Sequence, residues 1–313
     1  MPQPRQLATN PLAETLTVPD GLTATVPRQL VHRASVAETL LTGGTSTDTD
    51  RFTVFAQWPR AHQLHVSPDR SAYEPLLVAE TVRQAGTLLA HTAYEVPLGH
   101  KFVLKEMRFS THPEHLAVGS APAELAIHIT VSDIDRRGGR VAGFRYDADV
   151  RIGGERVATA HTAATWTSDA VYRRLRGGRS AATVSALPVP PGLPPAAVDR
   201  ALPADVVLAP SGDPDRWRLR VDTAHAVFFD HPLDHVPGML LLEAVRQAVS
   251  ARTRNGRRTP VSFRTVFHQY AELDQPIWIE AADGRDAHDA DVQVVGQQGE
   301  STVFECEVGT EAA

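Results

Sequence analysis

The sequence predicts an α+β protein built from two tandem repeats, each a long helix wrapped by an antiparallel sheet. The motif E-x-V-R-Q-A occurs twice, at residues 80–85 and 243–248, in runs that are apolar on almost every side. A helix that is apolar nearly all round must be buried, and an enclosing sheet buries it. Both runs are followed by several alternating strand patterns, and a proline-rich stretch at 185–205 separates the copies.

The 313 residues suit two moderate domains. Residues 1–30 are rich in Pro and Thr without periodicity, so we expect an N-terminal arm. Residues 31–184 form the expected first repeat. The stretch 185–205 holds six prolines, which favour extended backbone, and is therefore the expected linker. Residues 206–313 form the expected second repeat.

The elements follow one order in both repeats. Residues 39–57 and 206–222 each offer a short apolar strand, a turn with Gly and Asp, and an alternating strand after D-R. His-containing loops follow at 58–65 and 225–231, and then the long helix. Alternating patterns after the helices predict strands at 102–109, 123–134, 139–152 and 155–166, and at 261–267, 276–281, 290–296 and 302–308. The I-G-G-E turn at 152–155 predicts a hairpin.

Composition excludes several classes of function. The net charge of −6 argues against a nucleic-acid binder. Cys306 is the sole cysteine, which excludes an intramolecular disulfide and a Cys-based zinc site. His112 and His115 lack a third ligand at suitable spacing, so we expect a turn there, with no metal and no cofactor. Without an apolar leader or a run of 18 apolar residues, we expect a cytoplasmic protein that does not contact a membrane.

Both central helices carry a narrow polar stripe on an otherwise apolar surface. The stripes consist of Glu80, Arg83 and Gln84 in the first copy and Glu243, Arg246 and Gln247 in the second. One interpretation is an ordinary Glu–Arg pair, worth a few tenths of a kcal/mol. The other is a polar cleft between the repeats, because burying charges costs several kcal/mol and the stripe occurs twice.

The start of the second helix differs from that of the first. The sequence H-V-P-G-M leaves the N–H groups of Gly238 and Met239 unpaired at the first turn. Such donors suit a carbonyl oxygen that gains negative charge in acyl chemistry. The first copy reads Y-E-P-L-L and lacks the glycine. If one copy works as an oxyanion site, we expect the second.

These motifs resemble a known family. D-H-P-L-D-H-V-P-G-M-L-L-L-E-A (230–244) resembles the signature of hotdog-fold acyl-carrier-protein dehydratases and thioesterases. Residues 31 to 270 resemble, more closely, the A-factor biosynthesis (AfsA-like) family of actinobacteria, the γ-butyrolactone and butenolide synthases. The shared motifs are V-H-R-A-S (31–35), L-L-V-A-E-T-V-R-Q-A (76–85), V-P-L-G-H-K-F (96–102), H-P-E-H-L-A-V-G (112–119), Y-R-R-L-R-G (172–177) and D-H-V-P-G-M-L-L-L-E-A-V-R-Q-A (234–248).

The resemblance implies a double hotdog and an acyltransferase. The family joins a β-ketoacyl group from acyl carrier protein to the hydroxyl of dihydroxyacetone phosphate, and the ester closes to a butenolide phosphate on the way to a signalling molecule that controls antibiotic production. Carried over by motif, the functional positions are Glu80, Glu243 and Arg246. Carrier protein and dihydroxyacetone phosphate are the implied partners, and the chain is expected to be a monomer or a homodimer.

The expected mechanism uses Glu243 or Glu80 as general base on the acceptor hydroxyl. The N–H groups of Gly238 and Met239 hold the thioester oxygen. Arg246, together with Arg83, pairs with the acceptor phosphate. Gln247, in the same stripe, is a further candidate substrate ligand.

Two histidines precede the Pro-Gly pair. His231 and His235 are both candidates for a catalytic histidine, and His235 is preferred because it lies in the D-H-V-P-G element. A structural hydrogen bond between His235 and Asp234 that caps the helix is an equally supported alternative.

A basic cluster follows the first repeat. Arg173, Arg174 and Arg176, with Arg179, form either a solvated loop edge or a docking patch for an acidic carrier protein. Two other functions fit the same motifs: a dehydratase or thioesterase on acyl thioesters, or a non-catalytic lactone- or acyl-binding regulator.

Overall fold

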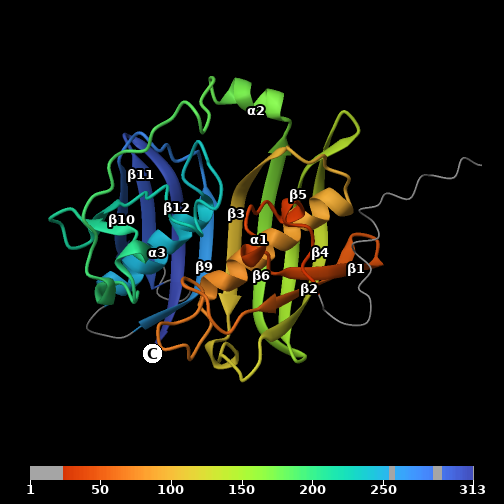
Figure 1. Cartoon of the computed structure of the whole chain (residues 1–313), viewed down its shortest axis with the longest axis horizontal. Helices are drawn as coiled ribbons and strands as arrows, with labels where there is room; N and C mark the ends of the chain where they lie inside the picture. The colour runs from red at the N-terminus through yellow and green to blue at the C-terminus, as the bar shows by residue number, and fades with distance from the viewer. Residues whose placement is uncertain (1–23, 254–257, 285–290, 313) are drawn as a thin grey trace, which may run out of the picture.

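The computed structural model describes residues 24–253, 258–284 and 291–312, in which one curved sheet carries two central helices on the same face (Figure 1). The first repeat contains β1 (Leu41–Asp48), β2 (Arg51–Trp58), α1 (Pro75–Thr92), β3 (Lys101–Thr111), β4 (Ala123–Arg137), β5 (Arg140–Ile152), β6 (Glu155–Thr167) and α2 (Asp169–Leu175). The second contains β7 (Leu208–Pro210), β8 (Arg216–Leu219), α3 (Gly238–Arg252), β9 (Arg258–Phe267), β10 (Ile277–Asp283), β11 (Val292–Gln298) and β12 (Ser301–Ala312).

The strand order shows the duplication directly. It runs β1-β2-β4-β5-β6-β3-β9-β12-β11-β10-β8-β7, so the strands follow the same order outward from the centre in both directions. β3 and β9 pair antiparallel at the centre, where Phe109 lies opposite Phe263 and their rings stack at 4.7 Å. The two repeats are therefore related by a pseudo-twofold axis between these strands.

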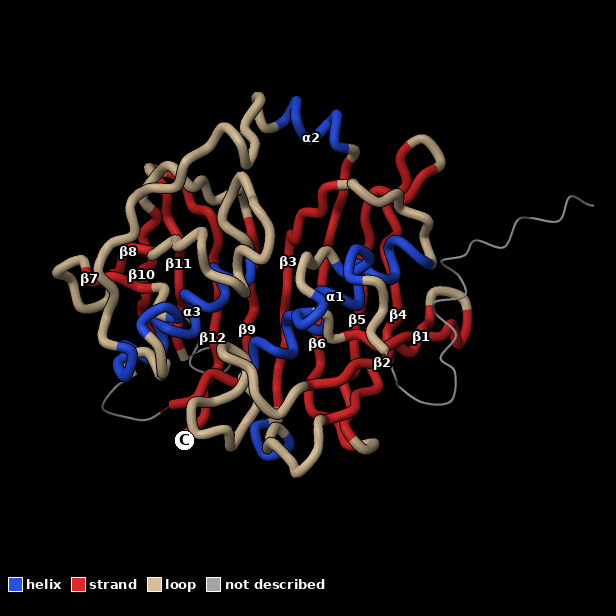
Figure 2. Tube along the Cα trace, in the orientation of Figure 1, coloured by secondary structure: helices blue, strands red, loops and turns tan. Residues whose placement is uncertain are grey.

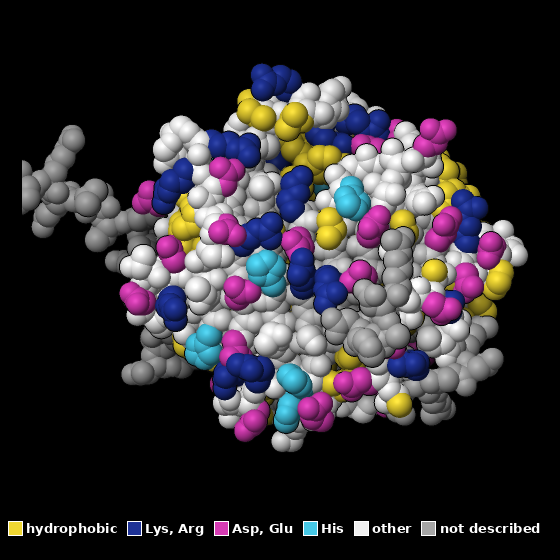
Figure 3. All heavy atoms as spheres, turned by 180° about the vertical axis from the view of Figure 1, so that it is seen from behind, with side chains coloured by type: hydrophobic (Ala, Val, Ile, Leu, Met, Phe, Trp, Pro, Cys, Tyr) yellow, Lys and Arg dark blue, Asp and Glu magenta, His cyan; other side chains and the backbone are white. Residues whose placement is uncertain are grey.

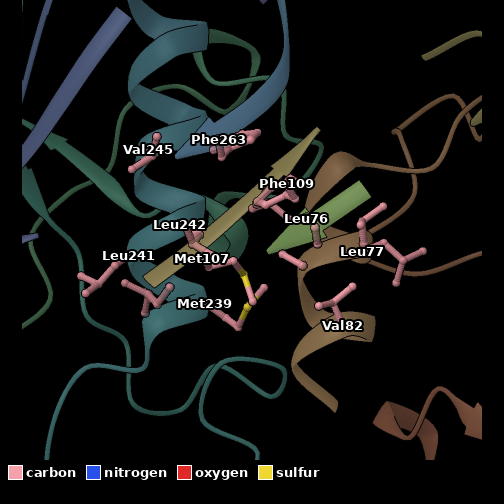
Figure 4. Close-up of a cluster of buried hydrophobic side chains, with 14 of the residues drawn as sticks. Leu76, Leu77, Val82, Met107, Phe109, Met239, Leu241, Leu242, Val245 and Phe263 are labelled. Carbon is pink, nitrogen blue, oxygen red and sulfur yellow. The ribbon is translucent and has the colours of Figure 1, made fainter. Parts of the chain in front are cut away.

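The main core lies where the two helices meet the central strands (Figure 4). The labelled side chains are Leu76, Leu77 and Val82 of α1, Met107 and Phe109 of β3, Met239, Leu241, Leu242 and Val245 of α3, and Phe263 of β9. Each central helix is buried over most of its length, as the apolar runs predicted. The opposite face of the sheet carries charged side chains of both signs (Figure 3), which accounts for the alternating strand patterns.

The second repeat begins inside the predicted linker. Short 3-10 turns at Pro195–Ala197 and Pro203–Asp205 correspond to those at Arg28–Val31 and Val36–Glu38 in the first repeat. His32 and Asp199 each follow the first turn of their pair and share a left-handed backbone, with φ of 55° and 51°. V-H-R-A (31–34) and V-D-R-A (198–201) are thus equivalent segments.

The last residues of the predicted N-terminal arm belong to the first repeat. Residues 24–30 pack into the first repeat, where Val26 and Leu30 are buried. Residues 1–23 lie outside the described part of the chain. Within that part, no helix is long and apolar enough to cross a membrane.

Candidate active site

Glu243 lies at the centre of a buried cluster in the second repeat. Arg200 donates to both carboxylate oxygens, at 2.8 and 2.6 Å, and Arg246 donates at 3.0 Å to each. Gln247 adds a bond of 2.6 Å. The side chains of Glu243 and Arg200 are 1% and 2% exposed. The Arg200 guanidinium, which the sequence interpretation missed, comes from the predicted linker.

Glu80 has the equivalent partners in the first repeat. Arg33 and Arg83 donate to its carboxylate at distances of 2.7 to 3.0 Å, and Gln84 donates at 2.7 Å. We call these two clusters the Glu80 clamp and the Glu243 clamp. Arg200 occupies in one the place that Arg33 occupies in the other.

Each clamp ties its central helix to the segment of 3-10 turns that precedes the first strand of the repeat. Gln84 accepts from the N–H of Leu40 and donates to Glu38 O, while Gln247 accepts from Val207 and donates to Asp205 O. The arginines repeat this arrangement, because Arg83 donates to Val31 O and Arg246 to Val198 O. The polar stripes are thus mainly connections within each repeat.

The clamp carboxylates are ionised. Burial raises the pKa of Glu243, but the charges of Arg200 and Arg246 outweigh burial and hold it at about 2. Burial likewise opposes ionisation of Glu80, yet Arg33 and Arg83 keep its pKa far below the ordinary value. A carboxylate of low basicity whose oxygens already accept several hydrogen bonds is poorly suited to take a substrate proton.

A cavity of about 900 Å³ lies between the middle of α1, the start of α3 and strand β3. Aromatic and aliphatic side chains line one part of it, among them Phe102, Leu104, Phe144, Trp166 and Phe267. Basic groups line another, among them His32, Arg33, Arg83, Lys101 and His231. The pseudo-symmetric place lies between the start of α1 and the middle of α3. There Arg200 bonds Leu64 O at 3.0 Å and faces Glu74 at 3.6 Å, as Arg33 bonds Val227 O at 3.0 Å and faces Asp230 at 3.8 Å beside the cavity.

The predicted site residues divide into two groups. Arg83, Arg173, His235, Gly238 and Met239 line the cavity. The residues that lie away from its wall are Glu80, Arg174, Arg176, Glu243, Arg246 and Gln247. The structure therefore brings together the start of the second helix, the preceding histidine and one arginine of the first helix.

The N-terminus of α3 opens onto the cavity. Gly238 and Met239 line it at the first helical turn, and within the described residues their N–H groups donate no hydrogen bond. The counterpart, α1, begins with Pro75, which has no N–H. Of the two central helices, as far as the structure describes them, only α3 begins with two consecutive free donors.

His235 is held by Asp234 beside this helix start. Its Nδ1 lies 2.7 Å from Asp234 Oδ1, which leaves Nε2 with the lone pair in the neutral ring. Burial raises the pKa of Asp234, but hydrogen bonds from His235 and Tyr172 outweigh burial and keep the pKa below the ordinary range. The predicted contact with Asp234 is present and holds the histidine at the cavity wall, but it does not cap α3, whose N-cap residue is Pro237 with no side-chain hydrogen bond.

A second pair, His231 and Asp230, joins the loop before α3 to the first repeat. His231 Nδ1 lies 2.5 Å from Asp230 Oδ1, and Asp230 Oδ2 accepts from the N–H of Ala34 at 2.8 Å. Arg33 lies 3.8 Å from the same carboxylate oxygen. This loop is thus attached to the Glu80 clamp, which fixes the position of α3 relative to α1.

His32 forms a neutral part of the basic wall. Its Nε2 lies 2.8 Å from His91 Nε2, and His91 Nδ1 lies 2.6 Å from Val96 O. Burial, then His91 and Arg83, lower the pKa of His32 to about 3. Lys101 and Arg83 therefore supply positive charge here, and His32 does not. Within the described residues, no group of three His, Cys, Asp or Glu side chains could hold a metal ion.

Solved structures show the same kind of fold. The chain is similar to an acyl-ACP thioesterase from Bacteroides thetaiotaomicron, with a TM-score of 0.52 and 13% identity, covering 85% of this chain and 100% of that one. It is also similar to a 12:0-ACP thioesterase from Umbellularia californica, with a TM-score of 0.50 and 13% identity, covering 83% and 94%. The predicted double hotdog is confirmed.

Sequence comparison then gives the family. Residues 15–168 and 181–310 match the A-factor biosynthesis hotdog domain, and the chain belongs to this family. It is 48% identical over 294 residues to a 2-oxo-3-(phosphooxy)propyl 3-oxoalkanoate synthase of Streptomyces virginiae, covering 93% of this chain and 99% of that protein. A synthase of the same name from Streptomyces coelicolor is 40% identical over 281 residues, 89% of each chain.

Proposed function

We propose that this protein is an acyltransferase that moves a β-ketoacyl group from acyl carrier protein to the hydroxyl of dihydroxyacetone phosphate, and that the product leads to a butenolide phosphate. The relatives' shared name describes an ester between a 3-oxoalkanoate and a phosphorylated three-carbon ketone. The observation that carries the proposal is one cavity that combines free N–H donors, a His–Asp pair, basic side chains and an apolar wall.

The thioester carbonyl is assigned to the start of α3. The N–H groups of Gly238 and Met239 stabilise the negative charge that develops on this oxygen when the alcohol attacks. The acyl chain extends along the apolar wall formed by Phe102, Phe144 and Trp166.

His235 is assigned the proton transfers. Its Nε2 takes the hydroxyl proton as the alcohol oxygen bonds to the carbonyl carbon. The C–S bond then breaks, and the same nitrogen returns the proton to the departing thiolate. Asp234 holds the ring and stabilises the imidazolium, as the acid of a catalytic triad does. No proton is gained or lost overall.

Arg83 and Lys101 are assigned to the acceptor phosphate. Both line the cavity, and the side chain of Arg83 is 25% exposed, whereas that of Arg246 is 4% exposed. We assign Glu80, Glu243, Arg246 and Gln247 to the clamps, where they hold the fold. Arg173 and Arg174 of α2 remain the proposed docking site for carrier protein, and the buried Arg176 is not part of it.

The test follows the products by mass. Purified protein is incubated with a β-ketoacyl thioester, with and without dihydroxyacetone phosphate. We expect a phosphorylated ester or butenolide only when the acceptor is present. Hydrolysis or dehydration of the thioester without acceptor identifies a thioesterase or dehydratase instead.

His235→Gln tests the proton transfer. We expect kcat to fall at least about 100-fold, the usual contribution of a general base. His112→Gln, at an exposed histidine outside the cavity wall, is the matched control and keeps full activity. Near-normal turnover by a folded His235→Gln variant refutes this assignment.

A further inference from the structure

We propose that helix α2 is the positioning element of the active site, with Tyr172 and Arg176 setting the orientation and charge of the Asp234–His235 pair. This inference rests on the proposed role of His235. Sequence reasoning placed Arg176 in a docking patch and gave Tyr172 no role. The structure places both against the same buried carboxylate.

Tyr172 shares one oxygen of Asp234 with the histidine. Its hydroxyl donates to Asp234 Oδ1 at 2.7 Å, and His235 Nδ1 lies at the same distance from that oxygen. The hydroxyl also lies 3.3 Å from His235 Nδ1. Burial and the neighbouring Asp234 carboxylate raise the pKa of Tyr172, so the phenol stays a donor throughout the working range.

Arg176 binds the other oxygen of Asp234 and the loop between β9 and β10. It donates to Asp234 Oδ2 at 3.1 Å and to Asp234 O at 3.2 Å. Its remaining donors form a bidentate pair with Glu272 at 2.6 and 2.8 Å. Its guanidinium also stacks over Tyr270, at 4.5 Å from the ring centroid, and Tyr270 packs edge-on against His235 at 4.8 Å.

These contacts join the two repeats across the cavity. α2 directly follows β6 of the first repeat and lies at the upper edge of the molecule (Figure 2), whereas Asp234 and Glu272 belong to the second. Tyr172 and Arg176 are four residues apart, so they project from the same face of the helical turn. Arg173 and Arg174 point to other faces and are exposed.

The charges around His235 determine whether loss of Arg176 moves the acid limb of the kcat/KM profile to higher or lower pH. The groups that face it are Asp234, Tyr172 and Arg176, together with Tyr270 and Glu272 beyond β9. Arg176 compensates two carboxylates at once. Its removal leaves the Asp234 carboxylate without a paired arginine and Glu272 with Arg179 alone, and this loss of positive charge stabilises the imidazolium form of His235. Because the neutral ring takes the hydroxyl proton, the acid limb of the kcat/KM profile then moves to higher pH.

The experiment measures kcat/KM against pH with a small β-ketoacyl thioester, so that carrier docking does not enter. For Arg176→Gln we expect the acid limb to move upward by about one pH unit. Arg176→Lys keeps the charge and restores the limb to near its original position. For Tyr172→Phe we expect kcat to fall about tenfold with little change in KM. Leu175→Gln, on the exposed side of the same helix, is the control and changes neither quantity.

The possible results separate this inference from the proposed function. If His235→Gln is inactive but Tyr172→Phe and Arg176→Gln keep the original kcat and acid limb, α2 has no positioning role. If His235→Gln is fully active, the proposed function itself fails. Tyr172→Phe removes a single oxygen and keeps the ring packing, so it decides the question even if Arg176→Gln does not fold.

Discussion

The two repeats carry the same clamp but differ at the start of the central helix. Glu80 and Glu243 each bind two arginines and a glutamine, and each cluster ties a helix to its own preceding turns. The start of α3 lines the cavity with Gly238 and Met239, whereas α1 begins with Pro75, which has no N–H. The clamp, which both repeats contain, holds the fold. The groups found in one repeat alone form the candidate site.

This difference separates the duplicated motif from the groups proposed for catalysis. Repetition of a charged stripe in an apolar helix signals a common requirement of both repeats. Each repeat must attach a segment of 3-10 turns to its helix, so each needs the clamp. A single active cavity instead requires residues in which the copies differ, and Gly238 against Pro75 is such a difference.

The largest expected effect is on stability. Glu243→Ala leaves Arg200 and Arg246 buried without their carboxylate, so we expect the free energy of unfolding to fall by about 3–5 kcal/mol. Glu80→Ala should cost less, because water in the cavity reaches Arg83. Urea unfolding of both variants measures the difference. A stable, inactive Glu243→Ala variant would contradict the clamp and restore Glu243 as the base.

The second comparison uses the equivalent arginines of the two clamps. Arg83→Gln removes a charged donor from the cavity, and we expect the KM for dihydroxyacetone phosphate to rise about 10- to 100-fold. Arg246→Gln should lower stability and leave that KM unchanged in the folded fraction, because Arg246 lies away from the cavity wall. Steady-state kinetics at varied concentrations of dihydroxyacetone phosphate test the expectation for each variant. Equal changes in KM for the two variants would show that both clamps contact the acceptor.

The smallest expected effect concerns the exposed face of α2. The double change Arg173→Glu and Arg174→Glu reverses charge at side chains in contact with water, and we expect a several-fold higher KM for carrier-bound substrate. The KM for a small thioester should stay the same. Steady-state kinetics with carrier-bound substrate and with the small thioester, measured in parallel, test this expectation. An equal rise for both donors would place these arginines in the reaction and not in docking.

The sequence predicted much of the fold because periodicity reports which face of an element is buried. Every predicted strand after the two helices is present, and the I-G-G-E turn joins β5 to β6. The proline-rich stretch predicted as the linker contains the 3-10 turns that match those before β1. Six prolines signal extended backbone, but they do not reveal that Arg200 packs back onto the helix.

The candidate site was predicted in part. Local signals found Gly238, Met239 and His235, because a Pro-Gly helix start leaves free donors and a histidine precedes it. Lys101, Tyr172 and His32 were missed, since each reaches the cavity from a distant segment. The agreement between V-H-R-A and V-D-R-A is the sequence signal that could have identified Arg33 and Arg200 as equivalent.

The sequence by itself determined that the chain is a duplicated pair of buried helices with enclosing strands, and that the second helix alone begins with free donors. These are properties of local pattern and backbone chemistry. Only the tertiary structure decided which polar residues meet solvent in a cavity and which neutralise one another inside the fold. The Glu and Gln of the stripe are held inside the fold in both repeats, whereas Arg83 reaches the cavity and its counterpart Arg246 does not.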